Sequence, residues 1–548
     1  MRVAEAVGRT LAQLGVEQVF GVVGSGNFHV TNALVAGGAS FVAARHENGA
    51  AMMADAFSRS TGRVSVVSLH QGCGLTNAMT GITEAAKSRT PVLVVSGDTP
   101  GTQRTSNFWI DQATAVAALG AEVERIHTPE TAVADATRAF RRALLERRTV
   151  LLNLPLDVQE ADVDWDDSLV TGVPERLPAG PAPEAVHRLA DLLAGAQRPV
   201  LVGGRGALYA RAELERLADS CGALLGTSAV ARGLFAGHPW SLDVMGGFAT
   251  DAVAELIQEA DVLVSFGAAL NRWTTRNGTL VRPGTTVVQV DLDLEAIGHH
   301  RPAQLGVVGD SAAVAAAVAA ELERRPEAAA GYRSDAVAEL IRSGARWQDV
   351  PFADTGTADR IDPRALTIAL DRMLPMERVV VPDGGNFNGY PAMFFDVPDQ
   401  WGYCLPLAFQ SIGLALPAAI GSAVARPGRV AIAGVGDGGL MMSLTELDTA
   451  VRLRLPLVVV VYNDDAYGAE VHHFAPEGAP LDTVVFPETD IAAVARGFGC
   501  TGVTVRGPED LAAVADWVDG PRDVPLVIDA KITSFPSWVL AHTFAGGE

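Results

Sequence analysis

Short, unbroken hydrophobic runs recur along this chain and alternate with longer stretches of mixed hydrophobic and polar residues. The runs are rich in valine, isoleucine and leucine and lack polar alternation, a pattern typical of strands buried on both faces of a sheet. The stretches between them have the length of helices, so the chain predicts the βα repeat of parallel sheets. The predicted strands are Val64–Leu69, Val92–Ser96, Val150–Leu154, Val200–Val202, Val262–Phe266, Val287–Val290, Val379–Val381, Val430–Ala433, Val458–Val461 and Leu526–Ile528.

Two changes in composition divide the chain. Residues 160–183 are acidic and then rich in proline and glycine, and residues 323–362 are charged with few hydrophobic runs. A chain of 548 residues is also too long for one hydrophobic core. We therefore expect an α/β protein of three doubly wound parallel-sheet domains, spanning residues 1–165, 183–325 and 355–548.

The formal net charge of −22 argues against nucleic acid or an anionic membrane as a partner. The N-terminal segment lacks the hydrophobic centre of a signal peptide, and no hydrophobic run is long enough to span a membrane. The cysteines Cys73, Cys221, Cys404 and Cys500 are scattered and suggest neither a disulfide framework nor a zinc site. The expected location is the cytoplasm.

Two motifs carry the chemistry, and each follows a predicted strand. They are Gly436-Asp437-Gly438-Gly439 and Asn463-Asp464-Asp465-Ala466-Tyr467-Gly468, with residues 440–455 between them predicted as a crossover helix. The two strand ends should therefore meet at one edge of a parallel sheet, where such sheets bind ligands. Two carboxylates beside glycine-rich turns suit a divalent cation that holds a diphosphate.

This pair of motifs resembles the thiamine diphosphate (ThDP) signature of the pyruvate decarboxylase and acetolactate synthase superfamily. The resemblance implies that the side chains of Asp437 and Asp464 and the carbonyl of Ala466 bind Mg²⁺. Members often have asparagine where Asp464 stands, but aspartate is an equally hard oxygen ligand. The remaining motif residues, Gly436, Gly438, Gly439, Tyr467 and Gly468, would surround the cofactor.

The segment Arg45-His46-Glu47-Asn48-Gly49-Ala50-Ala51 resembles the part of these enzymes that activates ThDP. By this resemblance, the Glu47 carboxylate hydrogen-bonds the aminopyrimidine nitrogen N1′ and so promotes removal of the C2 proton. The resemblance further implies that the first and third domains are ThDP-binding folds. It also implies a homodimer or homotetramer, in which Glu47 acts on a cofactor held by the partner subunit.

Further positions follow from the same resemblance. Ile412, within residues 411–421, would support the bent shape of the cofactor, and Asn386 would approach the diphosphate. Gly24 and Ser25 belong to a loop, residues 20–27, that would contact cofactor or substrate. In the middle domain, residues 199–206 resemble the start of a domain that binds FAD in some members. The later FAD-contacting stretches are not recognisable at residues 243–250 and 268–276, so we expect no FAD.

The residues that would select the reaction point in different directions. His70 and Asn77-Ala78-Met79 match benzoylformate decarboxylase, and Glu470 lies where pyruvate decarboxylases carry a catalytic glutamate. Overall resemblance favours acetolactate synthase-like chemistry, in which a 2-oxo acid is decarboxylated and the fragment joins a second carbonyl. The alternative is a simple 2-oxo acid decarboxylase. A non-catalytic binding protein of the same fold is disfavoured by the retained Glu47.

Overall fold

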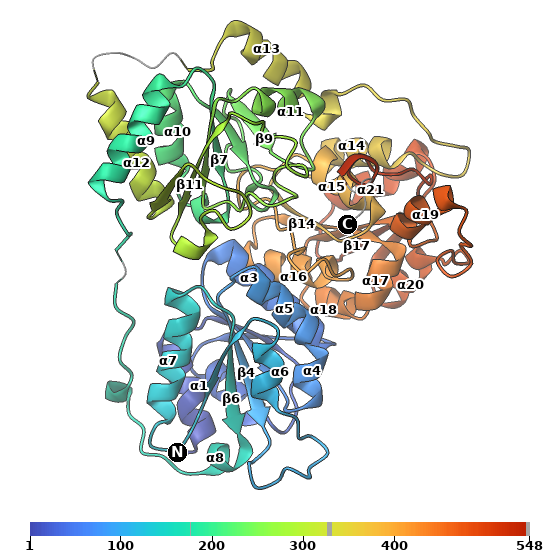
Figure 1. The fold of residues 1–548 in the computed structure, drawn as a ribbon. Helices are drawn as coiled ribbons and strands as arrows, with labels where there is room; N and C mark the ends of the chain where they lie inside the picture. Colours follow the sequence, from blue (N-terminus) through green and yellow to red (C-terminus); the bar gives the residue numbers. More distant parts are fainter. Residues whose placement is uncertain (176, 326–330, 544–548) are drawn as a thin grey trace.

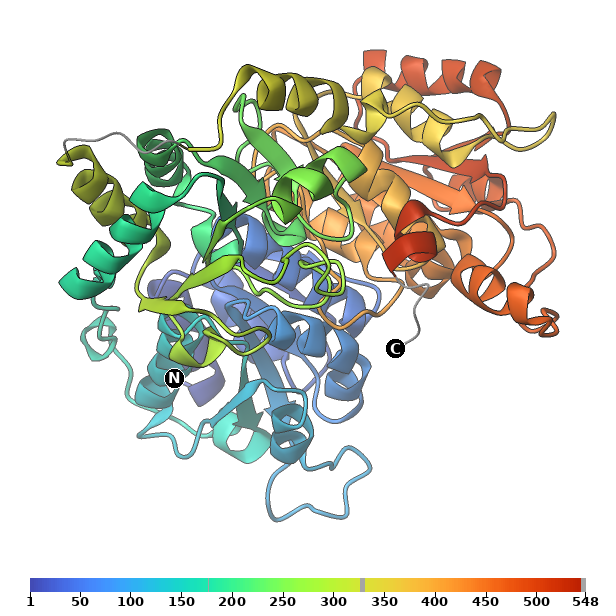
Figure 2. The same ribbon diagram turned by 45° about the horizontal axis from the view of Figure 1, so that its top comes forward.

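The computed structural model describes residues 1–175, 177–325 and 331–543. The predicted third domain includes residues 544–548, and the two predicted connecting segments include residues 176 and 326–330; these lie outside the described residues. The strands form three separate sheets, and every pairing within them is parallel. Figures 1 and 2 show them as three lobes, coloured blue, green, and orange to red.

The first sheet has the order β2-β1-β3-β4-β6-β5. Its strands are β1 Gln18–Gly21, β2 Ser40–Ala43, β3 Ser65–Leu69, β4 Val92–Asp98, β5 Glu122–Arg125 and β6 Val150–Pro155. The helices of this lobe are α1 Val3–Gln13, α2 Phe28–Ala36, α3 Glu47–Thr61, α4 Cys73–Asn77, α5 Met79–Lys87, α6 Gln112–Ala117, α7 Ala132–Leu145 and α8 Leu156–Glu160.

The second sheet has the order β12-β11-β10-β7-β8-β9. Its strands are β7 Pro199–Gly203, β8 Leu224–Thr227, β9 Ser241–Val244, β10 Val262–Phe266, β11 Thr286–Asp291 and β12 Leu305–Val308. The accompanying helices are α9 Pro183–Gly195, α10 Arg211–Cys221, α11 Asp251–Gln258, α12 Ser311–Glu323 and α13 Asp335–Gly344.

The third sheet has the order β13-β14-β15-β17-β16. Its strands are β13 Arg378–Pro382, β14 Val430–Gly436, β15 Leu457–Asn463, β16 Thr501–Val505 and β17 Leu526–Lys531. The helices are α14 Pro363–Met373, α15 Gly389–Phe394, α16 Ala415–Ala425, α17 Asp437–Ser443, α18 Glu446–Arg452, α19 Gly468–Phe474, α20 Ile491–Gly497, α21 Ala512–Asp519 and α22 Trp538–Thr543.

The three parallel-sheet α/β domains expected from the sequence are confirmed, and every predicted strand coincides with an observed one. The strands that the sequence did not reveal lie at or next to the edges of sheets. Several of them carry polar or exposed residues, whereas β1 and β8 are fully buried but only four residues long. Strand β5, for example, is Glu-Val-Glu-Arg. One expectation was wrong: the single helix predicted at 440–455 is two helices, α17 and α18, separated by a turn at Leu444 and Thr445.

Helices α3 and α16 join the first and third lobes, and Figure 1 shows them side by side. Met52 and Met53 of α3 share a hydrophobic core with Leu416 and Ala419 of α16. The backbones approach closely because residue 421 is glycine: a Cβ built there would lie 2.2 Å from the carbonyl oxygen of Met53. This contact fixes the two candidate cofactor domains relative to each other within one chain.

All three lobes meet around a buried group of charges. Arg59 donates to Glu84 over 2.6 Å and lies 2.7 Å from Asp55. Glu84 accepts the backbone N–H groups of residues 408 and 409 from the third lobe, and Arg205 of the second lobe donates to the Ser88 carbonyl. The central lobe is thus docked through a buried guanidinium that has a backbone acceptor.

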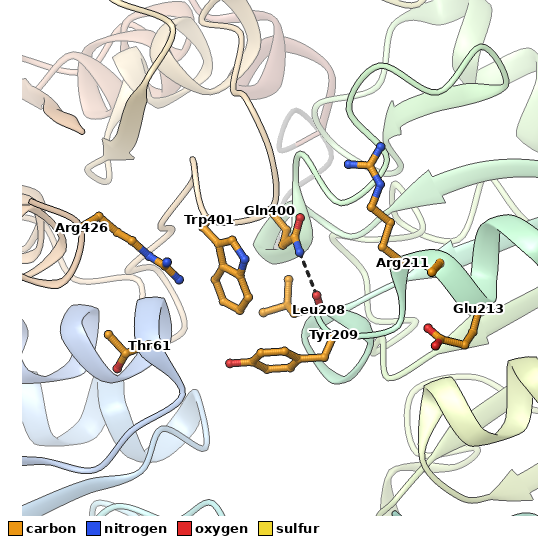
Figure 3. A pocket seen from close by; sticks show the side chains of 9 residues that line it. Thr61, Leu208, Tyr209, Arg211, Glu213, Gln400, Trp401 and Arg426 are labelled. Atoms are coloured by element: carbon orange, nitrogen blue, oxygen red, sulfur yellow. Dashed lines mark hydrogen bonds between the residues drawn. The ribbon is translucent and has the colours of Figure 1, made fainter. Parts of the chain in front are cut away.

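A surface pocket of about 520 Å³ lies at the same three-lobe junction (Figure 3). The rings of Tyr209 and Trp401 lie 5.1 Å apart, the Arg426 guanidinium lies 4.9 Å from the Trp401 ring centre, and Gln400 donates to the Leu208 carbonyl. None of the predicted site residues lines this pocket. The presence of a surface pocket therefore does not by itself identify the candidate active site. In the described ranges, no helix is both long enough and hydrophobic enough to cross a bilayer.

Candidate active site

Glu47 is the first residue of α3 and is half-buried. The preceding residue, His46, is extended, and its Nδ1 accepts the N–H of Asn48, which caps the helix. The side-chain amide of Asn77, at the end of α4, donates to Glu47 Oε2 over 3.0 Å. One carboxylate oxygen of Glu47 is therefore fixed by a neutral donor.

His70 and Glu47 flank the same glycine. A Cβ built at Gly74 would lie 3.2 Å from the Cβ of His70 and 3.6 Å from Glu47 Oε1. His70 Nδ1 lies 2.9 Å from the Gln71 carbonyl, which only accepts, so Nδ1 carries the proton. Nε2 is then an acceptor, and the Ser25 hydroxyl lies 3.4 Å from it.

The loop at Gly24 and Ser25 depends on close approach to that histidine. A Cβ built at Gly24 would lie 2.5 Å from His70 Cδ2, so a larger residue would push the loop and the ring apart. The Phe108 ring also packs against this histidine, with its centre 5.0 Å from that of His70. Gly24, Ser25, Glu47 and His70, which were predicted separately, thus form one cluster in the first domain.

The two predicted metal-binding carboxylates follow neighbouring strands. Asp437 begins α17 after β14, Asp464 follows β15, and these strands pair in parallel. Burial raises the pKa of Asp437 to about 6. Burial and then the charge of Asp437 raise the pKa of Asp464 to about 7. Two half-buried carboxylates, one of which raises the pKa of the other, form a donor set that suits a divalent cation.

Glycines leave the space beside these carboxylates. A Cβ built at Gly438 would lie 2.5 Å from the Tyr467 ring, and one at Gly468 would lie 2.2 Å from Asp464 Oδ2. Among the described residues no three or more acidic, histidine or cysteine side chains form a metal cluster. The expected set is smaller than such a cluster, since two carboxylates would be joined by a backbone carbonyl and by cofactor oxygens. The residues present fit Mg²⁺ and a diphosphate.

Asp465, between the two expected ligands Asp464 and Ala466, has a left-handed backbone with φ of 55°. Its carboxylate accepts from Arg360 over 2.5 Å, and its N–H donates to Asn463 Oδ1 over 3.1 Å. Aspartate tolerates this conformation better than most residues. Hydrogen bonds from Arg360 and to Asn463 therefore stabilise the turn that would present the Ala466 carbonyl.

Asp383 supports the Ile412 loop and was not predicted as a site residue. It is fully buried and accepts the N–H groups of Gly384, Gly413 and Leu414, while burial raises its pKa to about 6. A Cβ built at Gly384 would lie 3.1 Å from Ile412 Cγ2. The signal available in the sequence was an acidic residue directly after the strand β13.

Two other predicted residues, Asn386 and Glu470, differ in their contacts and exposure. Asn386 uses both ends of its amide on the C-terminal segment, donating to the Phe535 carbonyl and accepting the N–H of Ser537. Its backbone and Cβ remain near the metal turn, since a Cβ built at Gly468 would lie 3.5 Å from Asn386 Cβ. Glu470 is exposed in the first turn of α19.

Comparison with known proteins assigns the chain to a family. Residues 1–118 match the thiamine pyrophosphate enzyme N-terminal TPP binding domain, 186–318 the central domain, and 383–530 the C-terminal TPP binding domain. Thiamine pyrophosphate is another name for ThDP. The chain belongs to the thiamine pyrophosphate enzyme family, and the resemblance inferred from the two motifs is confirmed.

Relatives over nearly the full length differ in their activities. A probable 2-ketoarginine decarboxylase of Pseudomonas aeruginosa is 32% identical over 92% of this chain and 89% of its own. A sulfoacetaldehyde acetyltransferase of Rhodobacter capsulatus is 29% identical over 95% and 93%. The acetolactate synthase isozyme 3 large subunit of Escherichia coli is 27% identical over 93% and 90%. Membership of the family shows that this protein is a ThDP-dependent enzyme. Because the relatives differ in activity, the particular reaction has to be inferred from the residues of the site.

Proposed function

We propose that this protein uses ThDP and Mg²⁺ to decarboxylate a 2-oxo acid. The observation that carries the proposal is the pair of clusters described above, with Glu47 beside Asn77 in one ThDP domain and Asp437 beside Asp464 in the other. Bound ThDP supplies a nucleophilic carbon and an electron sink, the chemistry that releases carbon dioxide from a 2-oxo acid. Asp437, Asp464 and the Ala466 carbonyl would hold Mg²⁺ against its diphosphate.

Each first-domain residue then has a defined task. Asn77 orients the Glu47 carboxylate so that it can hydrogen-bond the aminopyrimidine ring at N1′. His70, with its proton on Nδ1, presents Nε2 to the Ser25 hydroxyl. A proton can pass between Ser25, His70 Nε2 and the reacting substrate. Glu470 is a further candidate for proton transfer on the other domain.

The His70–Ser25 pair favours protonation of the decarboxylated fragment, which releases an aldehyde. Carboligation to a second carbonyl, as in acetolactate synthase, is the second candidate, supported by the similarity to an acetolactate synthase subunit along most of the chain. The sequence alone favoured carboligation. The geometry of His70 gives the decarboxylase the more specific support, because carboligation needs the fragment to escape protonation.

The active unit of the proposal is a dimer or tetramer of this chain. Hydrophobic side chains are exposed on both ThDP domains: Phe108 and Trp109 are 45% and 37% exposed in the first domain, and Phe409 and Met442 are 42% and 58% exposed in the third. Surfaces of this kind on each half of a site favour a covering partner. A second copy would bring Glu47 of one subunit to the metal cluster of another.

The test combines product analysis with a matched pair of variants. The protein with ThDP and Mg²⁺ is offered pyruvate, 2-oxobutyrate, benzoylformate and 2-oxo acids with basic or branched side chains, and products are identified by mass. Aldehyde with carbon dioxide supports the decarboxylase, and a condensed hydroxy-ketone product supports carboligation. His70→Ala should slow aldehyde release by roughly a hundredfold, the usual contribution of an acid–base group, while His238→Ala, in the central domain, should not. Carbon dioxide from none of these acids would contradict the proposal.

A further inference from the structure

Glu446 of the third domain binds the backbone that leads into Glu47 of the first domain. It is the first residue of α18 and is 1% exposed. Its carboxylate accepts the N–H of Arg45 over 3.1 and 3.3 Å and the N–H of His46 over 3.0 Å. These contacts bridge about four hundred residues of sequence and end one residue before the predicted catalytic glutamate.

Neighbouring residues of α18 hold the same segment. Asp448 accepts from the Arg45 guanidinium over 2.6 Å, and Arg452 donates to the Ala43 carbonyl over 2.6 Å. Arg452 also contacts Asp448 over 2.7 Å, so these side chains form one network across the domain boundary. The entry into α3 is therefore fixed by one short helix of the other ThDP domain.

The packing leaves the Glu446 carboxylate little freedom. A Cβ built at Gly49, in the first turn of α3, would lie 2.3 Å from Glu446 Oε1, so the carboxylate occupies the space that a side chain there would need. The Thr449 hydroxyl donates to the other oxygen over 2.7 Å. Hydrogen bonds from neutral N–H groups to a buried carboxylate are among the stronger ones in proteins. Removing the carboxylate would leave the N–H groups of Arg45 and His46 without this acceptor.

We propose that Glu446 is a positioning residue for Glu47, which fixes the first turn of α3 so that the Glu47 carboxylate meets the aminopyrimidine ring in a productive geometry. This inference rests on the proposed role of Glu47. Activation through N1′ needs a hydrogen bond of defined length and direction, and small displacements at such sites are costly. Binding of Mg²⁺ and diphosphate depends on other residues. Loss of Glu446 should therefore impair activation more than cofactor affinity.

Two variants and a control separate positioning from general stability. Glu446→Gln keeps one acceptor oxygen, and Glu446→Ala keeps none. Asp371→Asn is the control, because Asp371 is also a buried carboxylate that accepts a backbone N–H, from Asp396, far from Glu47 in the sequence. The first measurement is hydrogen–deuterium exchange of the segment 44–48 in the full-length protein without added cofactor.

We expect exchange at residues 45 and 46 to rise at least about tenfold in Glu446→Ala, to rise less in Glu446→Gln, and to stay unchanged in Asp371→Asn. The second measurement is the rate at which bound ThDP exchanges its C2 proton for deuterium. That rate should fall about tenfold or more in Glu446→Ala, while the dissociation constant of ThDP changes less than about threefold.

The inference is overturned if residues 45 and 46 stay protected in Glu446→Ala, or if C2 exchange falls only as far as cofactor affinity does. A wild-type protein that exchanges the C2 proton no faster than Glu47→Ala would instead refute the proposed role of Glu47. The exchange result on the cofactor-free protein distinguishes these two failures, because it does not depend on the reaction.

Discussion

Asn77 donates its side-chain amide to Glu47 Oε2 over 3.0 Å. The two residues come from different helices, α4 and α3, and the contact leaves the second carboxylate oxygen on the side of Gly74 and His70. A neutral donor orients the carboxylate without adding a positive charge. Glu47 therefore keeps the ability to share a proton with a cofactor ring.

Substitution of Asn77 tests this orientation. Asn77→Ala should lower ThDP-dependent turnover roughly ten- to hundredfold, because a hydrogen bond to a charged group contributes about 1.5–3 kcal/mol. Asn77→Asp should be worse, since a second carboxylate would face Glu47. Steady-state kinetics over a range of ThDP concentrations measures both. Equal turnover in Asn77→Asp and the wild type would contradict the assigned contact.

At Asp464 we expect loss of the charge to affect stability and loss of the oxygen ligands to affect metal binding. The folded-state pKa of Asp464 is raised to about 7 by burial and the charge of Asp437, so its ionised form destabilises the metal-free protein as pH rises from about 4 to 7. Asp464→Asn should therefore stabilise the metal-free protein by roughly 1 kcal/mol or more. It keeps one side-chain oxygen, so it should retain most of the increase in melting temperature caused by Mg²⁺ with ThDP, whereas Asp464→Ala, which keeps none, should abolish that increase.

Thermal unfolding with and without Mg²⁺ and ThDP measures both effects. Asp523→Asn is a suitable control, because Asp523 pairs with Arg454 at the surface. If Asp464→Ala retains the full stabilisation by Mg²⁺ and ThDP, the assignment of Asp464 as a metal ligand is wrong.

The contact between α3 and α16 predicts a large effect of a single methyl group. Gly421→Ala would place a Cβ 2.2 Å from the carbonyl oxygen of Met53, so the helices would have to separate. We expect a loss of about 1–3 kcal/mol, as for other overpacked cores. Gly195→Ala, at a helical glycine with no neighbouring atom within 4 Å, should be neutral or stabilising. In urea unfolding, the midpoint of Gly421→Ala should therefore lie below that of Gly195→Ala. Equal midpoints would contradict the close packing of α3 and α16.

Asp362 predicts how stability depends on pH. It is fully buried at the N-terminus of α14, and although burial opposes its charge, hydrogen bonds from Arg364 and Thr355 lower its pKa to about 2. Because this pKa lies below the unfolded value of about 3.8, the stabilisation is complete above pH 4 and is lost as pH falls towards 2.

Asp362→Asn should therefore cost about 2 kcal/mol or more at neutral pH, and the difference from the wild type should shrink by about 1 kcal/mol at pH 3. Urea unfolding at both pH values measures it. A difference that stays constant or widens on acidification would show that the carboxylate is not held ionised in this way.

The sequence predicted most of the central strands but, among the edge strands, only β13. Strands such as Leu457–Asn463 are buried on both faces, so their composition is distinctive, whereas Glu122–Arg125 at an edge carries polar residues typical of a loop. The sequence also did not reveal the break between α17 and α18. Residues 444 and 445 contain neither glycine nor proline, and no local signal marks the turn there.

In the candidate site as well, some residues could be predicted from the sequence and others could not. The residues of the two motifs were predictable because glycines and carboxylates at strand ends carry a local signature. The supporting roles of Asn77, Asp383 and Glu446 were not predicted, since each acts through a contact with another segment, although Asn77 was noted within the run that matches benzoylformate decarboxylase. Glu446 meets residues 45 and 46 only because α3 and α16 bring the two domains together. Sequence identifies the groups that do chemistry more readily than those that hold them in place.

The central claim is that Glu47 activates ThDP in this protein. Its most direct test is the rate of deuterium exchange at C2 of bound ThDP with Mg²⁺, measured by NMR for the wild type and for Glu47→Gln. Acid–base groups usually contribute roughly a hundredfold or more to a rate, so we expect the C2 proton to exchange faster in the wild type than in Glu47→Gln by that factor. The ThDP affinities of the two proteins should differ far less. Equal exchange rates in the two proteins at saturating ThDP would contradict the account.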